Sequence, residues 1–347
     1  MDFIINGQGK GDVANVLMAN NFDVNALRPY IGKDGRSFIT VNQNGKPMSL
    51  VTNAPATLRK DEWIALDQAV VKAAKPRLQV VGDLRAAGLE YSIPNGMGKT
   101  TLETESQSDI ADASVSMDGL RQGDSDRPQY DLTSLPLPII HKDFQFSARQ
   151  VMASRNGGSP LDTTMAELAS RRVSEQIEKL TLGTAASFTY GGGTIYGLTN
   201  FPDRLTKTLT APTSSNHPLT VTEVLAMISQ AKGANYYGPF NIYYGSSWYG
   251  AMDEDYSTAK GDLTLRERLE KITSIGMCKP ADYLGANDLV LVQTTADVAR
   301  MVNGMDVTTV QWESMGGMQL NYKVMAILVP QLRSDYNDNC GIVHGSY

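Results

Sequence analysis

The sequence has few of the residues that mark catalytic, metal-binding or disulfide-rich proteins. It contains two cysteines, Cys278 and Cys340, and three histidines among 347 residues. Two thiols cannot build a disulfide framework or a four-thiolate zinc site, and they favour a reduced, cytosolic assembly environment. His141, His217 and His344 form no HxH or HxxxH pair. We therefore expect neither a metal nor a cofactor.

Long apolar runs and an excess of positive charge are also missing. The longest late apolar stretch, residues 324–330, is far shorter than the roughly 20 residues of a membrane span. The first ten residues do not resemble a signal peptide. The formal net charge is −6, whereas proteins that grip nucleic acid by its phosphates carry an excess of Lys and Arg. Residues 1–60 are the exception, because seven basic and four acidic side chains make them +3.

The length predicts two packed domains with extensions, since a single core stops growing at roughly 250–300 residues. Residues 1–56, with many Asn and Gly, predict an extended arm containing one short strand at 38–41. Thr57 can cap a helix that runs to about Ala74, and Pro76 ends it. Its apolar stripe consists of Trp63, Leu66, Val70 and Ala73. Strands are expected at 78–81 and 89–93.

Residues 102–146 predict a long hairpin. Apolar and polar side chains alternate from Ala111 to Met117, which is the period of a strand. A polar turn at 119–128 follows, and residues 130–146 can return as the second strand. The outbound arm and tip carry seven acids against Arg121 and Arg127. Because an isolated two-stranded hairpin is marginal in water, this one should rest on another surface.

The strongest predicted helix runs from about Thr163 to Leu182. Asp162 can cap it, and Gly183 stands where a C-terminal capping glycine belongs. Its expected inward stripe is Met165, Leu168, Ala169, Val173, Ile177 and Leu180. About twenty residues at 1.5 Å each span ~30 Å, so this helix can act as the backbone of a domain.

The remaining chain predicts mixed helices and strands, hence an α+β fold. Thr220 and Glu223 form a capping-box pattern that opens a helix to about Lys232, with Val221, Val224, Leu225 and Ile228 inward. A short charged helix is expected at 263–271. Strands are expected at 240–244, 289–292, 307–312, 318–330 and 342–344.

The sharpest enzymatic pattern is Ile93-Pro-Asn-Gly-Met-Gly-Lys-Thr100. A P-loop requires glycine at the first position, where Ile93 stands. It also requires a helix after the Lys-Thr pair, so that the helix N-terminus faces the phosphates. Residues 100–106 instead favour a strand or loop, so a glycine turn is the better interpretation. Asp335-Tyr-Asn-Asp-Asn339 lacks the glycine and the terminal Glu of a calcium loop, which favours a solvated turn.

The order of these parts is informative. An arm, a short helix with Trp63, an acidic hairpin, the segment 135–144 beginning Leu-Pro-Leu-Pro, and a long helix precede the α+β half. This order resembles the capsid fold of tailed bacteriophages, the Hong Kong 97 type, and most closely its encapsulin-like branch. Gly193-Thr-Ile-Tyr-Gly-Leu198 matches a turn of that family, and residues 58–67 resemble the N-terminal helix of encapsulins.

The resemblance implies a division of the chain into the parts of that fold. The parts are an extended arm (1–56), an N-terminal helix and strands (57–101), the E-loop hairpin (102–146), a peripheral domain with its spine helix (147–200, helix 163–182), an axial domain (201–310) and C-terminal strands that return to the peripheral domain (311–347).

The resemblance also implies a non-enzymatic structural role. The chain is expected to self-assemble as hexamers and pentamers into an icosahedral virion head, built in the bacterial cytoplasm, that encloses double-stranded DNA contacted without sequence preference. A separate scaffolding protein, a portal and a decoration protein would be its partners. An encapsulin-type compartment, another virion component and, remotely, a nucleotide hydrolase using Gly98, Lys99 and Thr100 are the alternatives.

The candidate contacts between subunits are charged. If the hairpin lies on a neighbouring subunit, its acids should meet basic residues there, and two arginines of the spine helix are the candidate partners. The candidate contact residues are Asp109, Asp112, Asp118, Arg121, Asp124, Asp126, Arg127, Arg171 and Arg172. The +3 arm is expected to line the interior of the shell.

Overall fold

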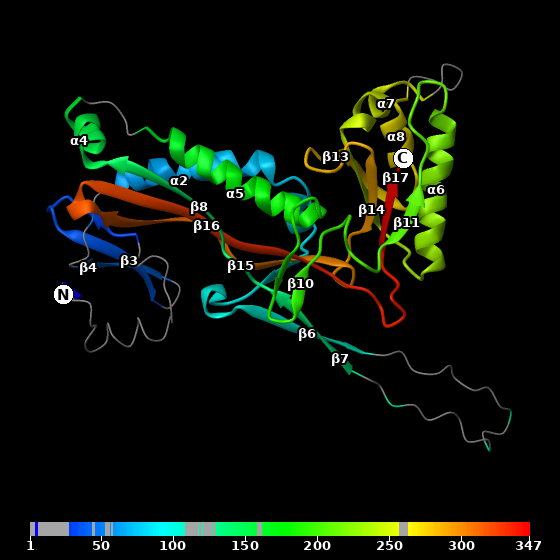
Figure 1. The fold of residues 1–347 in the computed structure, drawn as a ribbon, viewed down its shortest axis with the longest axis horizontal. Helices are drawn as coiled ribbons and strands as arrows, with labels where there is room; N and C mark the ends of the chain where they lie inside the picture. The colour runs from blue at the N-terminus through cyan, green and yellow to red at the C-terminus, as the bar shows by residue number, and fades with distance from the viewer. Residues whose placement is uncertain are drawn as a thin grey trace.

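The chain forms two lobes, each built on a β-sheet with helices packed against it (Figure 1). The computed structural model describes residues 4–5, 28–43, 46–52, 56, 58–107, 117, 120, 127, 130–157, 162–256 and 263–347. We call the lobe with the sheet order β5-β15-β16-β8 the peripheral lobe, and the lobe with the order β11-β17-β14-β12-β13 the axial lobe.

The peripheral sheet is organised around one long antiparallel hairpin. Its strands are β5 (Glu90–Ser92), β8 (Ile140–Ser147), β15 (Ala299–Ser314) and β16 (Gln319–Leu332). β15 and β16 pair along their whole length, with two register shifts between Asn303 and Thr308. Strands were expected at 307–312 and 318–330, and both are confirmed, but β15 begins eight residues earlier.

The helices of the peripheral lobe are α2 (Lys60–Ala74), α3 (Val80–Ala86), α4 (Ala148–Gly157) and α5 (Thr164–Leu182). The helix expected from Thr57 is confirmed as α2, with Arg59 at its N-cap. The strand expected at 78–81 is wrong, because these residues lead into α3. The sequence did not predict α4.

The spine helix α5 begins and ends as its sequence predicts. The Asp162 carboxylate accepts a hydrogen bond from the Thr164 backbone N–H at 3.0 Å, and Gly183 ends the helix with φ +86°. The expected inward stripe is wrong at its start, because Met165 and Leu168 are exposed. Small residues lie inward there, and the Ser170 hydroxyl donates to the Val70 carbonyl at 2.7 Å, so α5 approaches α2 closely.

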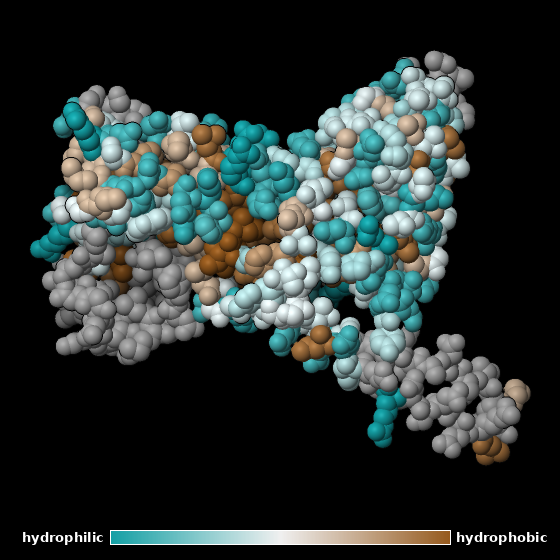
Figure 2. All heavy atoms as spheres, in the orientation of Figure 1, coloured by the Kyte–Doolittle hydropathy of each residue, from teal (hydrophilic) through white to brown (hydrophobic). Residues whose placement is uncertain are grey.

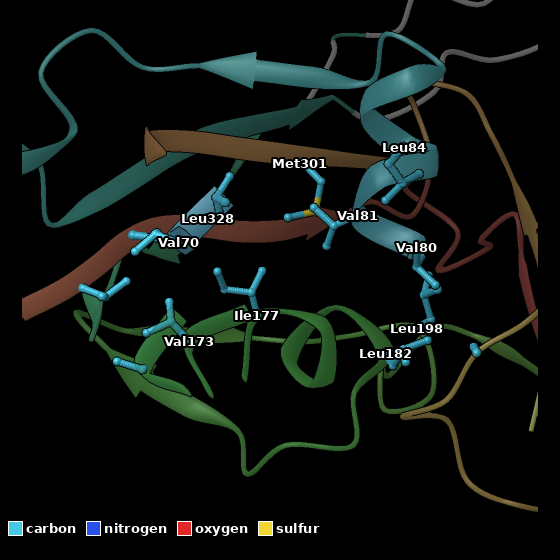
Figure 3. Close-up of a cluster of buried hydrophobic side chains, with 14 of the residues drawn as sticks. Val70, Val80, Val81, Leu84, Val173, Ile177, Leu182, Leu198, Met301 and Leu328 are labelled. Carbon is cyan, nitrogen blue, oxygen red and sulfur yellow. The ribbon is translucent and has the colours of Figure 1, made fainter. Parts of the chain in front are cut away.

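The core of the peripheral lobe lies between these helices and one face of the sheet. Figure 3 shows Val70 of α2, Ile177 of α5, Met301 of β15 and Leu328 of β16 pointing toward one another. Each of these four side chains is at most 2% exposed. Burial of side chains like these contributes roughly 1.5–3 kcal/mol each, which makes this cluster the main support of the lobe.

The N-terminal region is more structured than the expected arm. β2 (Tyr30–Ile31), β3 (Ser37–Gln43) and β4 (Lys46–Thr52) form a sheet with β1 (Ile4–Ile5), in the order β1-β4-β3-β2. Only the strand at 38–41 was predicted. The Arg28 guanidinium bonds both Asp67 oxygens, at 2.7 and 2.6 Å, and lies 4.7 Å from the Trp63 ring centroid. These contacts fasten the sheet to α2.

The axial sheet buries both of its faces. Its strands are β11 (Leu205–Thr208), β12 (Phe240–Tyr244), β13 (Ile275–Pro280), β14 (Asp288–Gln293) and β17 (Ile342–Ser346). One face packs on α6 (His217–Gly233), α7 (Tyr249–Asp253) and α8 (Leu265–Glu270). Tyr243, Val290 and Val292 face the other way and join the core of the peripheral lobe. The strands expected at 240–244 and 289–292 and the helix expected at 263–271 are confirmed.

Two expectations for this half are corrected. Helix α6 begins at His217, so Thr220 is a buried residue inside the helix and not its cap. Glu223 instead accepts hydrogen bonds from the Thr210 hydroxyl and backbone, at 2.7 and 3.2 Å. Strand β17 was expected to return to the peripheral domain, but it pairs with β11 and β14 in the axial sheet.

The long hairpin emerges from the peripheral lobe as β6 (Thr101–Gln107) and β7 (Tyr130–Pro136), paired antiparallel (Figure 1). Its expected return strand of 130–146 divides in two, because residues 140–147 leave the hairpin and join the peripheral sheet as β8. The alternating segment 111–117 lies outside the described residues except for Met117. A small hairpin, β9 (Phe188–Tyr190) and β10 (Gly193–Ile195), contacts β7.

Candidate functional site: two complementary surfaces

The β6–β7 ribbon presents an outward face that combines apolar and acidic side chains. Directly paired residues share one face of a ribbon, and Glu105 pairs with Leu132. Tyr130 and Leu132 are 64% and 58% exposed, and Glu103 and Glu105 are exposed beside them. Exposed apolar side chains that cluster with charged ones are typical of a surface that contacts another molecule.

The opposite face of the ribbon is anchored. Leu102 and Leu135 pack with Val302, Ile327 and Val329 on the peripheral sheet. The Gln331 amide donates to the Thr104 hydroxyl at 3.4 Å. The ribbon is therefore held at its base, with its outward face turned away from its own chain.

The β9–β10 hairpin is locked against the ribbon by glycine. A Cβ at Gly193 would lie 1.9 Å from the Ser134 carbonyl oxygen, and one at Gly197 would lie 2.2 Å from the Gly183 nitrogen. The turn 193–198, which matches the capsid family, thus needs glycine where it touches β7 and the end of α5. Phe188 and Tyr190, 42% and 54% exposed, add aromatic surface beside the ribbon.

A basic groove of about 360 Å³ lies between β8 and α5. Its charged and polar lining consists of His141, Lys142, Arg172, Glu175, Gln176 and Lys179, over Ile140 and Val173. The three exposed or half-exposed polar positions of this lining on α5, Arg172, Gln176 and Lys179, recur at three- and four-residue steps, so they share one side of the helix. Figure 2 shows hydrophilic residues over α5 and hydrophobic ones reaching the surface below it.

The two arginines of the spine helix are already engaged within their own helix. The Glu175 oxygens accept bonds from Arg171 at 2.6 Å and from Arg172 at 3.0 Å. Burial disfavours the charged form of Glu175, but hydrogen bonds from Arg171 and Tyr283 outweigh it and lower its pKa. Arg172 still lines the groove, whereas Arg171 does not.

The structure describes only some of the predicted contact residues. Arg171 and Arg172 lie on α5, and Arg127 is an exposed residue of the hairpin. Asp109, Asp112, Asp118, Arg121, Asp124 and Asp126 lie outside the described residues.

Sequence reasoning missed Lys142 and Lys179 of the groove. The signal for Lys179 was present, since it follows Arg172 by seven residues and thus lies on the same side of the helix. Lys142 had no such signal, because its place beside α5 depends on the pairing of β8 with β16.

The segment that resembles a P-loop does not have P-loop geometry. Asn95 has φ +56°, residues 96–98 form a single 3-10 turn, and strand β6 follows. A Cβ at Gly96 would lie 2.3 Å from the Gly304 carbonyl oxygen, so this glycine is needed where the turn packs against β15. Within the described residues 93–107, the Lys99-Thr100 pair is followed by strand β6 and not by the helix that a P-loop needs.

The histidines stand apart from one another, each beside a carboxylate. The closest approaches are 3.6 Å from His141 to Asp143, 3.1 Å from His217 to Glu254 and 3.3 Å from His344 to Asp288. His217 begins α6 and is 2% exposed, so it is a buried residue of that helix. Across the described ranges, no group of three or more His, Cys, Asp or Glu side chains could hold a metal ion.

Searched over the same ranges, the chain has no helix long and apolar enough to cross a membrane.

Comparisons with known proteins bear on the fold. A family model described as a family of unknown function (DUF6260) matches residues 53–345. No curated protein matches the chain. Among solved structures, the virus-like particle from Pyrococcus furiosus is similar with a TM-score of 0.58 and 15% identity, over 83% of this chain and 99% of that chain.

Two further structures are similar over most of the chain. The capsid of Myoviridae phage XM1 has a TM-score of 0.55 and 9% identity, over 72% of this chain and 86% of that chain. The capsid of the native GTA particle has a TM-score of 0.50 and 11% identity, over 76% and 89%. At these identities the likeness shows a shared fold.

Proposed function

This chain belongs to the family of unknown function DUF6260 and has the Hong Kong 97-type capsid fold, and we propose that it is the major capsid protein of a tailed bacteriophage. In this role it has no reaction to catalyse. It self-assembles as hexamers and pentamers into an icosahedral head that encloses double-stranded DNA. Its partners are a scaffolding protein, a portal and a decoration protein, and assembly takes place in the bacterial cytoplasm.

The observation that carries the proposal is the β6–β7 ribbon, one face of which is exposed among the described residues. A two-stranded ribbon is marginally stable in water, so its exposed Tyr130 and Leu132 call for a surface to rest on. The spine helix packs on one face of the peripheral sheet, and the base of the ribbon packs on the other. The base of the ribbon and the groove beside α5 therefore lie on opposite sides of the peripheral sheet, which supports a second copy as the source of the receiving surface.

We infer that the outward face of the ribbon docks in the basic groove of a neighbouring copy. Glu103 and Glu105 on the ribbon complement Lys142, Arg172 and Lys179 in the groove, and Leu132 complements the apolar floor of Ile140 and Val173. This changes the predicted contact set: Lys142 and Lys179 join Arg172, while Arg171 serves mainly to hold Glu175. The acidic tip of the hairpin extends the same complementarity.

The acidic balance of the whole chain fits a container for DNA. With a net charge of −6, the wall does not hold the packaged polymer tightly, because phosphate binding requires an excess of basic groups. The basic N-terminal region is the part proposed to face the interior.

The first test is the state of assembly of the purified full-length chain. Electron microscopy and analytical ultracentrifugation should show rings, sheets or shells, with aberrant forms where scaffolding protein is missing. A species that sediments as a 37.7 kDa monomer at all concentrations, with or without co-expressed scaffolding protein, would overturn the proposal.

The docking of the ribbon is tested by exchanging charges. Lys142→Glu should impair assembly by placing an acid opposite the acidic ribbon, and Glu105→Lys should do the same from the other side. The double variant should recover assembly, because the pair is restored with opposite orientation. Lys207→Glu on the exposed edge of β11 changes the net charge equally and is the matched control. Failure of the double variant to recover, with both single variants folded, would rule out this contact.

A second candidate is an encapsulin-type compartment, favoured by the match over 99% of the chain of the Pyrococcus furiosus particle. Such a shell would close without a scaffolding protein and would recruit an enzyme with a docking peptide. Expression of this chain alone separates the two: uniform closed shells with protein inside favour the compartment, and nuclease-protected DNA in purified particles favours the phage head.

A further inference from the structure

The two lobes meet at α3, which is tied to the spine helix beneath it and to the axial lobe beside it. Both carboxylate oxygens of Glu178 on α5 accept bonds from the first turn of α3, from Val80 N–H at 2.6 Å and from Val81 N–H at 3.4 Å. Glu178 is 1% exposed. A buried carboxyl group that accepts bonds from the otherwise unpaired amides at the start of a helix fixes the position of that short helix.

From α3, polar side chains reach across to the axial lobe. The Asp83 carboxylate accepts bonds from Lys279 Nζ at 2.6 Å and from the Tyr243 hydroxyl at 3.3 Å. Gln79 exchanges bonds with Asp282, as donor at 3.2 Å and as acceptor from its backbone N–H at 3.4 Å. The position of α3 therefore determines whether these contacts between the lobes can form.

Glu178 has no cationic partner of its own within the described ranges. Lys279 is used by Asp83, Arg85 pairs with Asp306 and Glu90, and Lys179 lies 5.5 Å from the Tyr283 ring centroid. On its own helix, Glu175 is neutralised by the two neighbouring arginines. The groups that face Glu178 are thus the α3 amides, the negative Asp83 and the neutral Tyr243 hydroxyl.

We propose that α3 is a proton-controlled latch between the two lobes, closed while Glu178 is protonated and loosened when it ionises. A neutral carboxyl still accepts the α3 N–H bonds at no charge cost. An ionised carboxylate places a buried negative charge near Asp83. The unfavourable energy of that charge falls when α3 moves away and water enters.

The protonation of Glu178 changes near neutrality. Burial, the largest effect, and the nearby Asp83 raise its pKa to about 7, against the opposing α3 amide bonds. Because the folded pKa is raised, the proton stabilises the closed latch fully below the usual value of 4.5, and this stabilisation is lost as pH rises through about 7. Figure 3 shows Val80, Val81 and Leu84 at this end of the core, where loosening of α3 would expose apolar surface.

The latch is a property of the folded chain, and only its effect on shell geometry rests on the proposed function. In a shell, the angle between the lobes of each subunit contributes to curvature. A pH rise would therefore give the subunit more freedom to change that angle.

Hydrogen exchange of the full-length chain at pH 6 and pH 8, corrected for intrinsic exchange rates, tests the latch. With a Glu178 pKa of about 7 closed and 4.5 open, the linkage predicts about a tenfold loss of protection in α3 and in residues 279–284 over this range. Glu178→Gln should stay protected at pH 8. Glu223→Gln, which also removes a carboxylate that accepts backbone bonds, is the control and should behave like the wild type.

Equal pH dependence in the wild type and Glu178→Gln would overturn the latch, whatever the state of assembly. If Glu178→Gln fails to fold, Asp83→Asn replaces it. Removal of that nearby charge should move the midpoint of the pH-dependent exchange to lower pH, and an unchanged midpoint would refute the inference.

Discussion

Trp63 is expected to join the N-terminal sheet to the peripheral lobe, and Trp63→Phe should weaken that junction selectively. The indole N–H donates to the Pro29 carbonyl at 3.1 Å, the Arg28 guanidinium lies over the ring, and Tyr322 meets it edge-on at 6.1 Å. Phenylalanine keeps the apolar contact with the sheet but cannot donate to Pro29 and gives Arg28 a weaker partner.

The magnitude follows from the lost contacts. A buried hydrogen bond contributes about 1 kcal/mol and a partly buried cation–π contact about 0.5–1 kcal/mol. The smaller ring leaves a gap that costs roughly 1 kcal/mol. Trp63→Phe should therefore lower the free energy of unfolding by about 3 kcal/mol. Most of that loss should appear first at residues 28–31, because two of the three contacts hold them.

The assay combines chemical denaturation with hydrogen exchange. The Ile31 N–H, which donates to the Leu58 carbonyl at 2.9 Å, should exchange faster in Trp63→Phe. Trp248→Phe is the matched control, since Trp248 is fully buried, donates to the Asn287 carbonyl at 3.2 Å and lies in the axial lobe. It should lose similar stability with no change at Ile31. If Trp63→Phe leaves Ile31 protected, or if both variants expose it equally, the reasoning is wrong.

Two further predictions concern a partly buried ion pair and a glycine. Burial opposes ionisation of Glu62, but bonds from Arg155, at 2.9 and 2.7 Å, outweigh it and lower its pKa. Its stabilisation is present above the usual 4.5 and lost as pH falls through the lowered value, so Glu62→Gln should flatten the acid branch of a stability–pH curve. Gly197→Ala places a Cβ 2.2 Å from the Gly183 nitrogen and should lower the free energy of unfolding by roughly 1–3 kcal/mol, measured by thermal denaturation. Gly233→Ala, with no atom within 4 Å, should be neutral or stabilising by about 0.5 kcal/mol.

Elements whose ends are determined by residues close to them in the sequence could be predicted. Asp162 and Gly183 bound α5, and Thr264 with Glu267 forms a true capping box at the start of α8. The short, mainly apolar run of β12 predicted a strand, and the structure buries every residue of it. For the two helices, the decisive interaction lies within a few residues of the element itself.

Elements decided by distant contacts could not be predicted. The run Leu78–Val81 is equally compatible with a strand and a helix, because short apolar runs carry no clear period. The choice is made by Glu178, which is about a hundred residues away in sequence and caps α3. The cap expected at Thr220 failed for a local reason, because Asn216 and Pro218 open the helix earlier, while Glu223 finds its partner in Thr210.

The same difference separates the two surfaces of the candidate site. The acidic hairpin is a continuous segment, so its charge and its need for a second surface follow from the sequence alone. The basic groove is assembled from β8 and α5, whose lining residues are some 30 positions apart, and depends on the register of β8 against β16. A sequence thus reveals the side of an interface that projects as one segment, whereas the receiving side emerges only after the sheet and helix have packed. Arg171, conspicuous in sequence beside Arg172, pairs with Glu175 of its own helix, and Lys142 is the partner that we propose for the ribbon.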